Sequence, residues 1–214
     1  MIELYGHRFA SFAWKALIAA YERGVDFAFR DVEQPENAAR VGALTPTGQF
    51  PAIIDDGVEI AGSNAVIAWL DRHGDAPPLV PEAREDRARA HMFADVFDDY
   101  IAQATNRFVG NALRPAGDRD PLALSEGATM FERTYPWLEA RIGAPWALGE
   151  RFTIADCAAA PALFYADWTY PIPDSCPNLK AYRARLLARP AVARVVEEAR
   201  PYRHYFPLGA PDRD

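Results

Sequence analysis

The sequence has only two cysteines and no long hydrophobic run. Cys157 and Cys176 have no neighbouring Cys or His at the spacing of metal ligands, which argues against a zinc site. No segment approaches the ~18 apolar residues of a membrane span, and the chain starts without the basic and apolar regions of a signal peptide. We therefore predict a cytoplasmic protein with no metal and no membrane partner.

Several familiar motifs are also missing. The chain contains no phosphate-cradling glycine loop, no GxSxG and no HExxH. Lysine is scarce, since Lys15 and Lys180 are the only two, and the formal net charge is −7. Neutralising nucleic-acid phosphates requires clustered basic side chains, and here arginines alternate with acids. Nucleic acid is not an expected partner.

What is present is enough apolar sequence for a substantial core, because half of the 214 residues are hydrophobic. In the first 75 residues, short apolar alternations are interleaved with helical spacing. They predict strands at 2–5, 25–32, 51–54 and 58–60, and helices at 11–23, 36–43 and 63–73. The order βαβ then ββα, with the first two strands parallel and an Asp-Gly hairpin at 55–57, predicts a mixed sheet.

The second half has a different composition. Three prolines within 75–81 rule out a continuing helix or central strand, so this stretch is predicted to be a linker. Beyond it, helices are predicted at 82–113, 120–142, 153–168, 177–188 and 190–199. The fold class is thus an α/β N-terminal domain at 1–75, a linker at 76–84 and an all-α bundle at 85–214. Cys157 lies in an apolar run, which favours a buried free thiol.

Three short segments could carry chemistry. Ser11 lies at the start of the first helix, where it could be an N-cap or could donate to an anion at the helix N-terminus. Pro51 begins a strand, and its peptide bond could be trans or cis; a cis bond would expose the Phe50 backbone to an extended peptide. Ser63, at a second helix start, could likewise be a cap or an anion site.

Taken in this order and spacing, these segments resemble the glutathione transferase superfamily. The resemblance covers nearly the whole chain. It includes Pro-Thr-Gly-Gln-Phe-Pro at 46–51, Gly-Ser-Asn-Ala at 62–65 and Phe-Thr-Ile-Ala-Asp at 152–156. It implies a thioredoxin-like N-terminal domain, and it implies that Thr153 and Asp156 form a structural capping box.

The resemblance also implies a glutathione site. Pro51 would be cis, and Phe50 would pair through its backbone with the cysteinyl part. Gln49 would contact the glycyl end, and Ser63 with Asn64 would bind the γ-glutamyl carboxylate. The family usually has Glu or Gln where this chain has Gly62, so one γ-glutamyl contact is expected to be missing.

The residue that activates the thiol is less directly implied. Ala10 occupies the position of the family's usual serine, and Ser11 is the nearest hydroxyl. Ser11 is the first candidate for the catalytic residue, backbone N–H groups alone are the second, and Tyr5 is the third.

The long helix at 82–113 carries several polar residues. Asp95, Asp99 and Asn106 are expected to share a face, which could be solvated or could line the electrophile pocket. In the second case Asp98 or Asp99 would cross a dimer interface toward the partner's glutathione. Trp14, Tyr165 and Trp168 are candidates for apolar pocket walls, or for core residues.

The leading functional hypothesis is a homodimeric glutathione transferase that conjugates glutathione to a small hydrophobic electrophile. Glutathione would be a co-substrate, and no tightly bound cofactor is expected. A noncatalytic binding or regulatory module of the same fold is an alternative because Ala10 and Gly62 remove two polar groups. A glutathione-dependent isomerase or thiol reductase would use the same thiol site.

Overall fold

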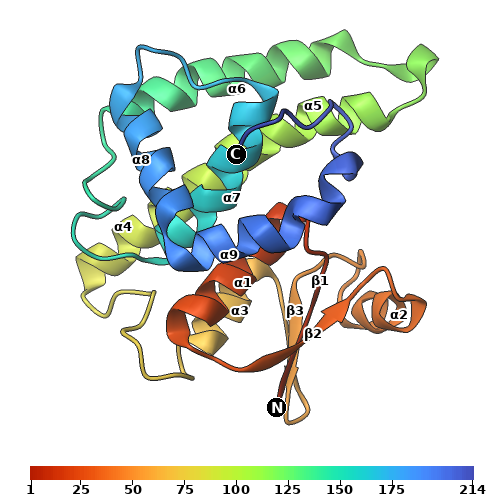
Figure 1. Ribbon diagram of the computed structural model, residues 1–214, viewed down its shortest axis with the longest axis vertical. Coiled ribbons are helices and arrows are strands. Elements are labelled where there is room, and N and C mark those ends of the chain that lie inside the picture. Colours follow the sequence, from red (N-terminus) through yellow and green to blue (C-terminus); the bar gives the residue numbers. More distant parts are fainter.

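The computed structural model describes residues 1–214 and is shown in Figure 1. Its first half alternates strands and helices, in the order predicted from the sequence. They are β1 (Ile2–Gly6), α1 (Ser11–Arg23), β2 (Phe27–Asp31), α2 (Pro35–Leu44), β3 (Ala52–Asp55), β4 (Val58–Ala61) and α3 (Ser63–Leu70).

The four strands form one mixed sheet in the order β2-β1-β3-β4. β1 pairs with β2 in parallel and β3 forms an antiparallel hairpin with β4, as predicted, and β3 also pairs antiparallel with β1. Because side chains alternate between the faces of a strand, Leu4 and Tyr5 of β1 point to opposite sides. Leu4 belongs to the core shared with α1 and α3, whereas Tyr5 packs with Val41 of α2. The sheet therefore has helices on both faces (Figure 1).

The second half is helical, as predicted. Proline begins α2, α6, α8 and α9, where its fixed φ suits the first helical turn. The elements are α4 (Arg84–Asp95), η1 (Val96–Ala102), α5 (Gln103–Leu113), η2 (Ala116–Asp118), α6 (Pro121–Glu139), α7 (Ile154–Thr169), α8 (Pro177–Ala188), α9 (Pro190–Ala199) and η3 (Arg200–Tyr205). Together with the mixed sheet, they give the fold that the sequence predicted.

One local feature differs from the prediction of a regular helix at 82–113. The middle segment, η1, is a π-helix between α4 and α5. Its i→i+5 hydrogen bonds bring residues five apart onto one face and so change which side chains point the same way. This rotation affects the acidic residues discussed below.

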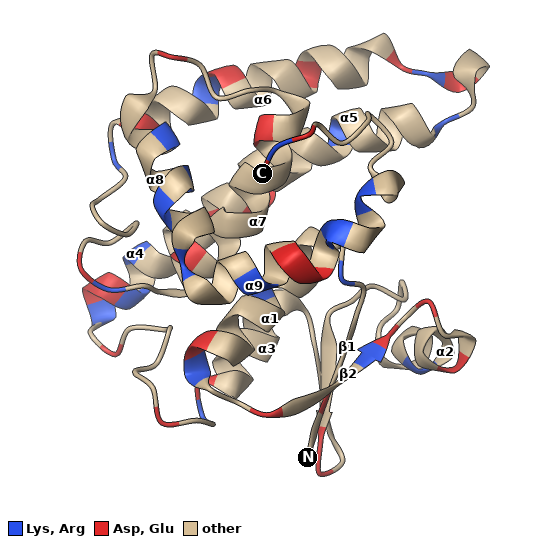
Figure 2. Ribbon diagram, viewed as in Figure 1, with Lys and Arg blue, Asp and Glu red and all other residues tan.

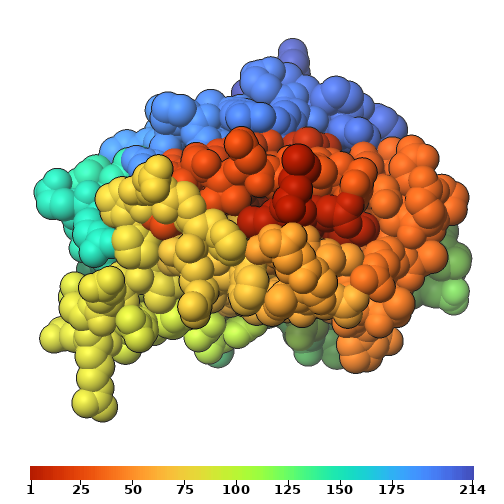
Figure 3. Space-filling view, turned by 90° about the horizontal axis from the view of Figure 1, so that it is seen from below, coloured from red at the N-terminus to blue at the C-terminus, as the bar shows by residue number.

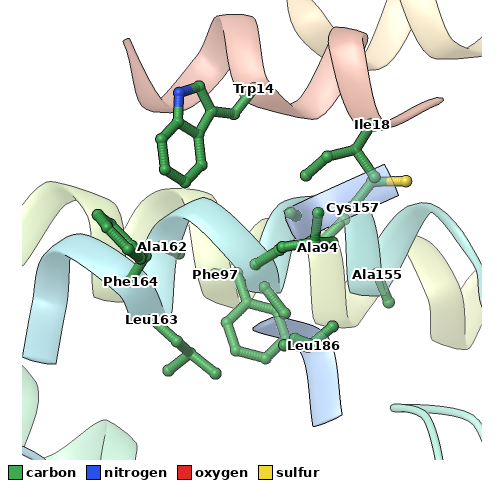
Figure 4. Packing of buried hydrophobic residues seen from close by; sticks show 14 of the residues in the cluster. Trp14, Ile18, Ala94, Phe97, Ala155, Cys157, Ala162, Leu163, Phe164 and Leu186 are labelled. Carbon is green, nitrogen blue, oxygen red and sulfur yellow. The ribbon is translucent and has the colours of Figure 1, made fainter. Parts of the chain in front are cut away.

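The core lies where α1 packs against the central helix α7. In Figure 4, Trp14 and Ile18 of α1 lie above Cys157 and Phe164 of α7, and Phe97 of η1 packs from the other side. Cys157 and Cys176 are buried free thiols, which confirms the prediction for Cys157. The two halves therefore share one continuous apolar core.

The start of α7 is fixed by the predicted capping box. The Thr153 hydroxyl accepts a hydrogen bond from the Ala155 N–H, and the Asp156 carboxylate accepts one from the Thr153 N–H at 2.8 Å. Both acceptors lie deep in the protein, which matches a structural role.

In the ribbon view of Figure 2, acidic and basic positions are interspersed along the outer helices and loops. Figure 3 shows the face covered by the N-terminal half, with the C-terminal helices along its upper edge. None of the helices is both long and apolar enough to cross a bilayer.

Candidate functional site

Two neighbouring cavities lie between the N-terminal half and the helical half. The larger, of about 880 Å³, is mainly polar in its lining; the smaller, of about 290 Å³, is lined by 15 residues of which 10 are hydrophobic. Four residues line both cavities: Ser11, Phe12, Phe50 and Asn106. A group bound at this boundary would face a polar site on one side and an apolar site on the other.

Ser11 lies at that boundary, but it is not the N-cap of α1. The first helical hydrogen bond runs from the Trp14 N–H to the Ala10 C=O at 3.0 Å, which makes Ala10 the N-cap. Of the two roles left open for Ser11, the N-cap is therefore wrong by one residue. Because Ser11 is the first helical residue, its hydroxyl is not used for capping and lies beside the unpaired N–H groups of the first turn.

The Phe50–Pro51 peptide bond is cis, as the family resemblance implied. Phe50 lies between the turn at 45–48 and β3, and neither its N–H nor its C=O takes part in a backbone hydrogen bond. Both groups are thus available to an extended peptide. Gln49 and Pro51 line the same large cavity.

Ser63 and Asn64 begin α3 at the opposite wall of the large cavity. Ser63 is the first helical residue and Gly62 the N-cap, so the capping alternative for Ser63 is wrong as well. The N–H groups of this first turn have no intrahelical partner, and the helix dipole favours an anion there. The large cavity therefore has an anion-binding end.

The Asn64 side chain is hydrogen-bonded inside the protein. Its Oδ1 accepts a hydrogen bond from Lys15 Nζ at 2.8 Å, and Lys15 also pairs with the Asp98 carboxylate. Burial raises the pKa of Asp98, while the adjacent Lys15 ammonium lowers it. Lys15 thus anchors the Asn64 side-chain oxygen, while the Asn64 N–H, in the first turn of α3, has no intrahelical partner.

Asp98 lines the cavity of its own chain. Asp98 pairs with Lys15 of the same chain, and the hypothesis that Asp98 or Asp99 crosses to a partner's site stays a prediction. Asp95 does not line the cavity, whereas Asp99, Gln103 and Asn106 do. The expectation of a face formed by Asp95, Asp99 and Asn106 assumes α-helical spacing throughout, whereas residues 96–102 are π-helical, and Asp98 lines the cavity in place of Asp95.

The small cavity is built mainly from the helical half. Tyr165 lines it, and the Tyr165 hydroxyl donates to the Phe9 C=O at 2.7 Å. Trp14 and Trp168 do not line it, because both are core residues packed against Phe164. Of the three aromatic candidates, only Tyr165 forms a cavity wall.

Tyr5, the third candidate for the thiol partner, lies away from both cavities. Its hydroxyl donates to Glu3 Oε2 at 2.9 Å, on the sheet face that α2 covers. Burial raises the Tyr5 pKa, and the bond to Glu3 adds to this effect. The tyrosine is therefore a weaker candidate than Ser11.

Sequence reasoning missed the C-terminal wall of the small cavity, formed by Tyr205, Phe206 and Pro207. The Tyr205 hydroxyl donates to Glu33 Oε1 at 2.8 Å, and the same oxygen lies 3.1 Å from His7 Nε2. Potential ligand atoms of His7, Glu33 and Asp31 lie within 4.8 Å of one another. Glu33 thus joins the loop before Ser11 to the C-terminal segment, through contacts that no local sequence pattern signals.

Comparison with known proteins agrees with this geometry. Residues 4–78 match the glutathione S-transferase N-terminal domain, and residues 121–185 match the glutathione S-transferase C-terminal domain. The chain belongs to the glutathione S-transferase superfamily.

Individual relatives span most of the chain. It is 26% identical to glutathione S-transferase GstB of Escherichia coli K12 over 72% of this chain and 76% of that protein. It is 24% identical to rat (Rattus norvegicus) maleylacetoacetate isomerase over 77% of each chain. A crystal structure of a glutathione S-transferase from Methylobacterium radiotolerans, in complex with glutathione sulfonate, matches with a TM-score of 0.78 and 26% identity, covering 91% of this chain and 94% of that one.

Proposed function

We propose that this protein is a glutathione transferase that activates the thiol of glutathione for attack on a small hydrophobic electrophile. The observation that carries the proposal is the pair of adjoining cavities with Ser11 and Phe50 at their boundary. Glutathione is the co-substrate in this proposal, and no tightly bound cofactor is required. Relatives named as enzymes favour catalysis over a noncatalytic binding module.

The proposed binding mode is the one that the family resemblance implies, and the geometry supports it. The free backbone groups of Phe50, beside cis Pro51, pair with the cysteinyl residue. Gln49 contacts the glycyl end, and the γ-glutamyl carboxylate binds at Ser63 and the Asn64 N–H. This places the thiol near Ser11, where the N-terminus of α1 favours the thiolate by about 0.3–2 kcal/mol.

Catalysis in this proposal depends on thiolate formation and proximity. Ser11 is the proposed catalytic residue, and its hydroxyl donates to the thiolate. A free thiol has a pKa of about 8.5, so lowering the pKa by one to two units makes the thiolate abundant at neutral pH. The apolar cavity then holds the electrophile against the sulfur.

Two related predictions complete the proposal. The N-terminal domain at 1–75 supplies the glutathione site, the linker spans 76–84, and the all-α domain at 85–214 supplies the electrophile cavity. The protein is a cytoplasmic homodimer, and an exposed apolar face supports dimerisation. On that face Tyr100 is exposed and lines a groove together with Val96, Met130 and Trp137, and Met92 of the preceding helix α4 is exposed as well.

Calorimetry with glutathione and a conjugation assay with a chloronitroaromatic substrate test the main proposal. We expect glutathione binding at millimolar concentration or below, and conjugation above the uncatalysed rate. If calorimetry detects no binding at several millimolar glutathione, the proposal is refuted.

A glutathione-dependent isomerase is the second candidate, because maleylacetoacetate isomerases are among the relatives. There the thiolate would add to a cis double bond, the resulting single bond would rotate, and elimination would return the thiol. Assay of a cis-dienone acid separates the two reactions, because isomerisation consumes no glutathione whereas conjugation consumes one molecule per turnover.

Gly62 offers a separate prediction. Gly62 has φ +92°, a conformation that costs other residues about 1–3 kcal/mol, but a side chain there would meet open space. We expect Gly62→Gln to lower the free energy of unfolding by about 1–2 kcal/mol. We also expect it to tighten glutathione binding by roughly 3- to 10-fold through one added hydrogen bond.

Urea unfolding and calorimetry check both effects. Gly57→Gln is the matched control, because Gly57 has φ +86° in the open β3–β4 turn and does not line the cavity. We expect this control to lose similar stability and keep the wild-type affinity. Unchanged affinity in Gly62→Gln would argue against the proposed γ-glutamyl position.

A further inference from the structure

Asn106 lies where the two cavities meet. It lines both of them, as Ser11 does, and these are the only two of the four boundary residues with a polar side chain. Ser11 begins α1 in the N-terminal half, whereas Asn106 belongs to α5 in the helical half. A bond between the thiol and an electrophile would therefore form between a hydroxyl from one half and an amide from the other.

The direction of the Asn106 side chain follows from helical spacing. The residues at the end of η1 and in α5 that line the small cavity follow the three- and four-residue spacing of one helix face. They are Ala102, Thr105, Asn106 and Val109. Asn106 is exposed, and its side-chain amide carries two N–H donors. This face of α5 therefore presents amide donors to the small cavity.

The other hydroxyls on the helical side of the small cavity are committed or out of reach. The Tyr165 hydroxyl donates to a backbone C=O of the loop before α1 at 2.7 Å, and the Tyr205 hydroxyl donates to a carboxylate of the β2–α2 loop at 2.8 Å. Thr105 Oγ1 is buried and not accessible to a ligand, although the residue lines the cavity. Apart from Ser11, Asn106 is thus the side chain that can donate to a ligand there.

Thiolate attack moves negative charge away from sulfur. In a chloronitroaromatic, a sulfur lone pair forms the C–S bond at the carbon that bears chlorine, and a π pair of the ring moves onto the ortho nitro group. That pair then returns to the ring as chloride leaves with the electrons of the C–Cl bond. Groups beside Ser11 stabilise the thiolate before the attack, so the charge that develops on the electrophile needs a donor of its own.

We propose that Asn106 is a second catalytic residue, whose side-chain amide donates a hydrogen bond to the electrophile oxygen that takes up this charge. The inference rests on the proposed function, and it names the electrophile class: the reacting carbon is conjugated to a nitro or carbonyl group. An unsaturated ketone fits in the same way, because thiolate addition places the charge on its enolate oxygen. Asn106 would thus serve conjugation and isomerisation alike.

The test compares a chlorodinitrobenzene with iodomethane at saturating glutathione. Iodomethane passes the charge directly to iodide and offers no oxygen to a donor, so its rate reports on the bound thiolate alone. Asn106→Leu keeps the size of the side chain and removes the donors. We expect it to lower kcat for the chlorodinitrobenzene by about 10- to 100-fold. Methylation should change by less than about twofold, and the pKa of the bound thiol should stay the same.

Gln103→Leu is the matched control, because Gln103 is an exposed amide on the same helix that lines only the large cavity. Any effect of this variant on glutathione would change both reactions alike, so the ratio of the two rates should keep its wild-type value. Both substitutions are at exposed positions, and urea unfolding checks that the variants fold.

Three outcomes would overturn the inference. In the first, Asn106→Leu keeps both wild-type rates or lowers both equally, so that Asn106 has no separate role at the electrophile. In the second, the wild-type protein accelerates the chlorodinitrobenzene reaction no more than methylation, relative to the reactions without enzyme. Both of these leave glutathione activation intact. In the third, the wild-type protein binds no glutathione, which refutes the proposed function and this inference with it.

Discussion

Asp156→Ala is expected to lower the free energy of unfolding by about 3–5 kcal/mol. The Asp156 carboxylate is fully buried and accepts hydrogen bonds from three separate parts of the chain. Its partners are the Thr153 N–H at 2.8 Å, the Ala147 N–H at 2.8 Å and the Tyr182 hydroxyl at 2.7 Å. One side chain therefore ties the start of α7 to the preceding loop and to α8.

The size of the effect follows from the donors that alanine would leave behind. Each buried donor without an acceptor costs about 1–3 kcal/mol, and alanine supplies no acceptor for any of the three. Asparagine retains one carbonyl oxygen, so Asp156→Asn should lose less stability than Asp156→Ala. The order wild type, Asn, Ala is thus expected from hydrogen bonding alone.

Urea unfolding followed by tryptophan fluorescence measures these differences. Asp174→Ala serves as the control, because the Asp174 side chain is fully exposed and pairs only with Lys180; it should change stability by less than about 0.5 kcal/mol. A loss below about 1 kcal/mol in Asp156→Ala would contradict the role assigned to this carboxylate.

The capping box around Asp156 was predictable because its signal is local. Thr153 and Asp156 are three residues apart before an apolar run, which is the spacing of the motif. The bounds of α8 and α9 were predicted for the same kind of reason, since Pro177 and Pro190 mark their first residues. The Asp-Gly turn at 55–57 likewise predicted the hairpin that β3 and β4 form.

The parts that sequence reasoning missed depend on contacts between distant segments. Nothing near Lys15 in the sequence indicates that it meets Asn64 and Asp98, which are 49 and 83 residues away. The π-helical turn of η1 could not be anticipated from helical periodicity, because that pattern assumes α-helical spacing along the whole segment. Tyr205 lines the small cavity and donates its hydrogen bond to Glu33, 172 residues earlier.

The starts of α1 and α3 show a further limit of prediction from sequence. Serine at a predicted helix start favours an N-cap, but at both Ser11 and Ser63 the helix begins with the serine itself. Ala10 and Gly62 take the cap positions without any side-chain hydrogen bond. The serine hydroxyls are thereby left for other partners, which a rule for helix stability does not anticipate.

Ser11→Ala is expected to raise the pKa of enzyme-bound glutathione thiol by about one to two units. A hydroxyl that donates to a thiolate stabilises the ionised form by about 1.5–3 kcal/mol, and one pKa unit corresponds to about 1.36 kcal/mol. Because Ala10 is the N-cap, the substitution removes no capping bond, and stability should change by less than about 0.5 kcal/mol. The chemical effect is therefore separable from folding.

The ultraviolet absorbance of the thiolate, followed against pH with saturating glutathione, measures this pKa directly. Ser63→Ala is the matched control, since Ser63 is the first residue of α3 as Ser11 is of α1; it should weaken binding without moving the thiol pKa. Tyr5→Phe should not move it either, because the Tyr5 hydroxyl bonds to Glu3 outside the cavities. A shift in Tyr5→Phe with none in Ser11→Ala would transfer activation to the tyrosine. No shift in either variant would leave the N-terminus of α1, with its unpaired N–H groups, as the group that holds the thiolate.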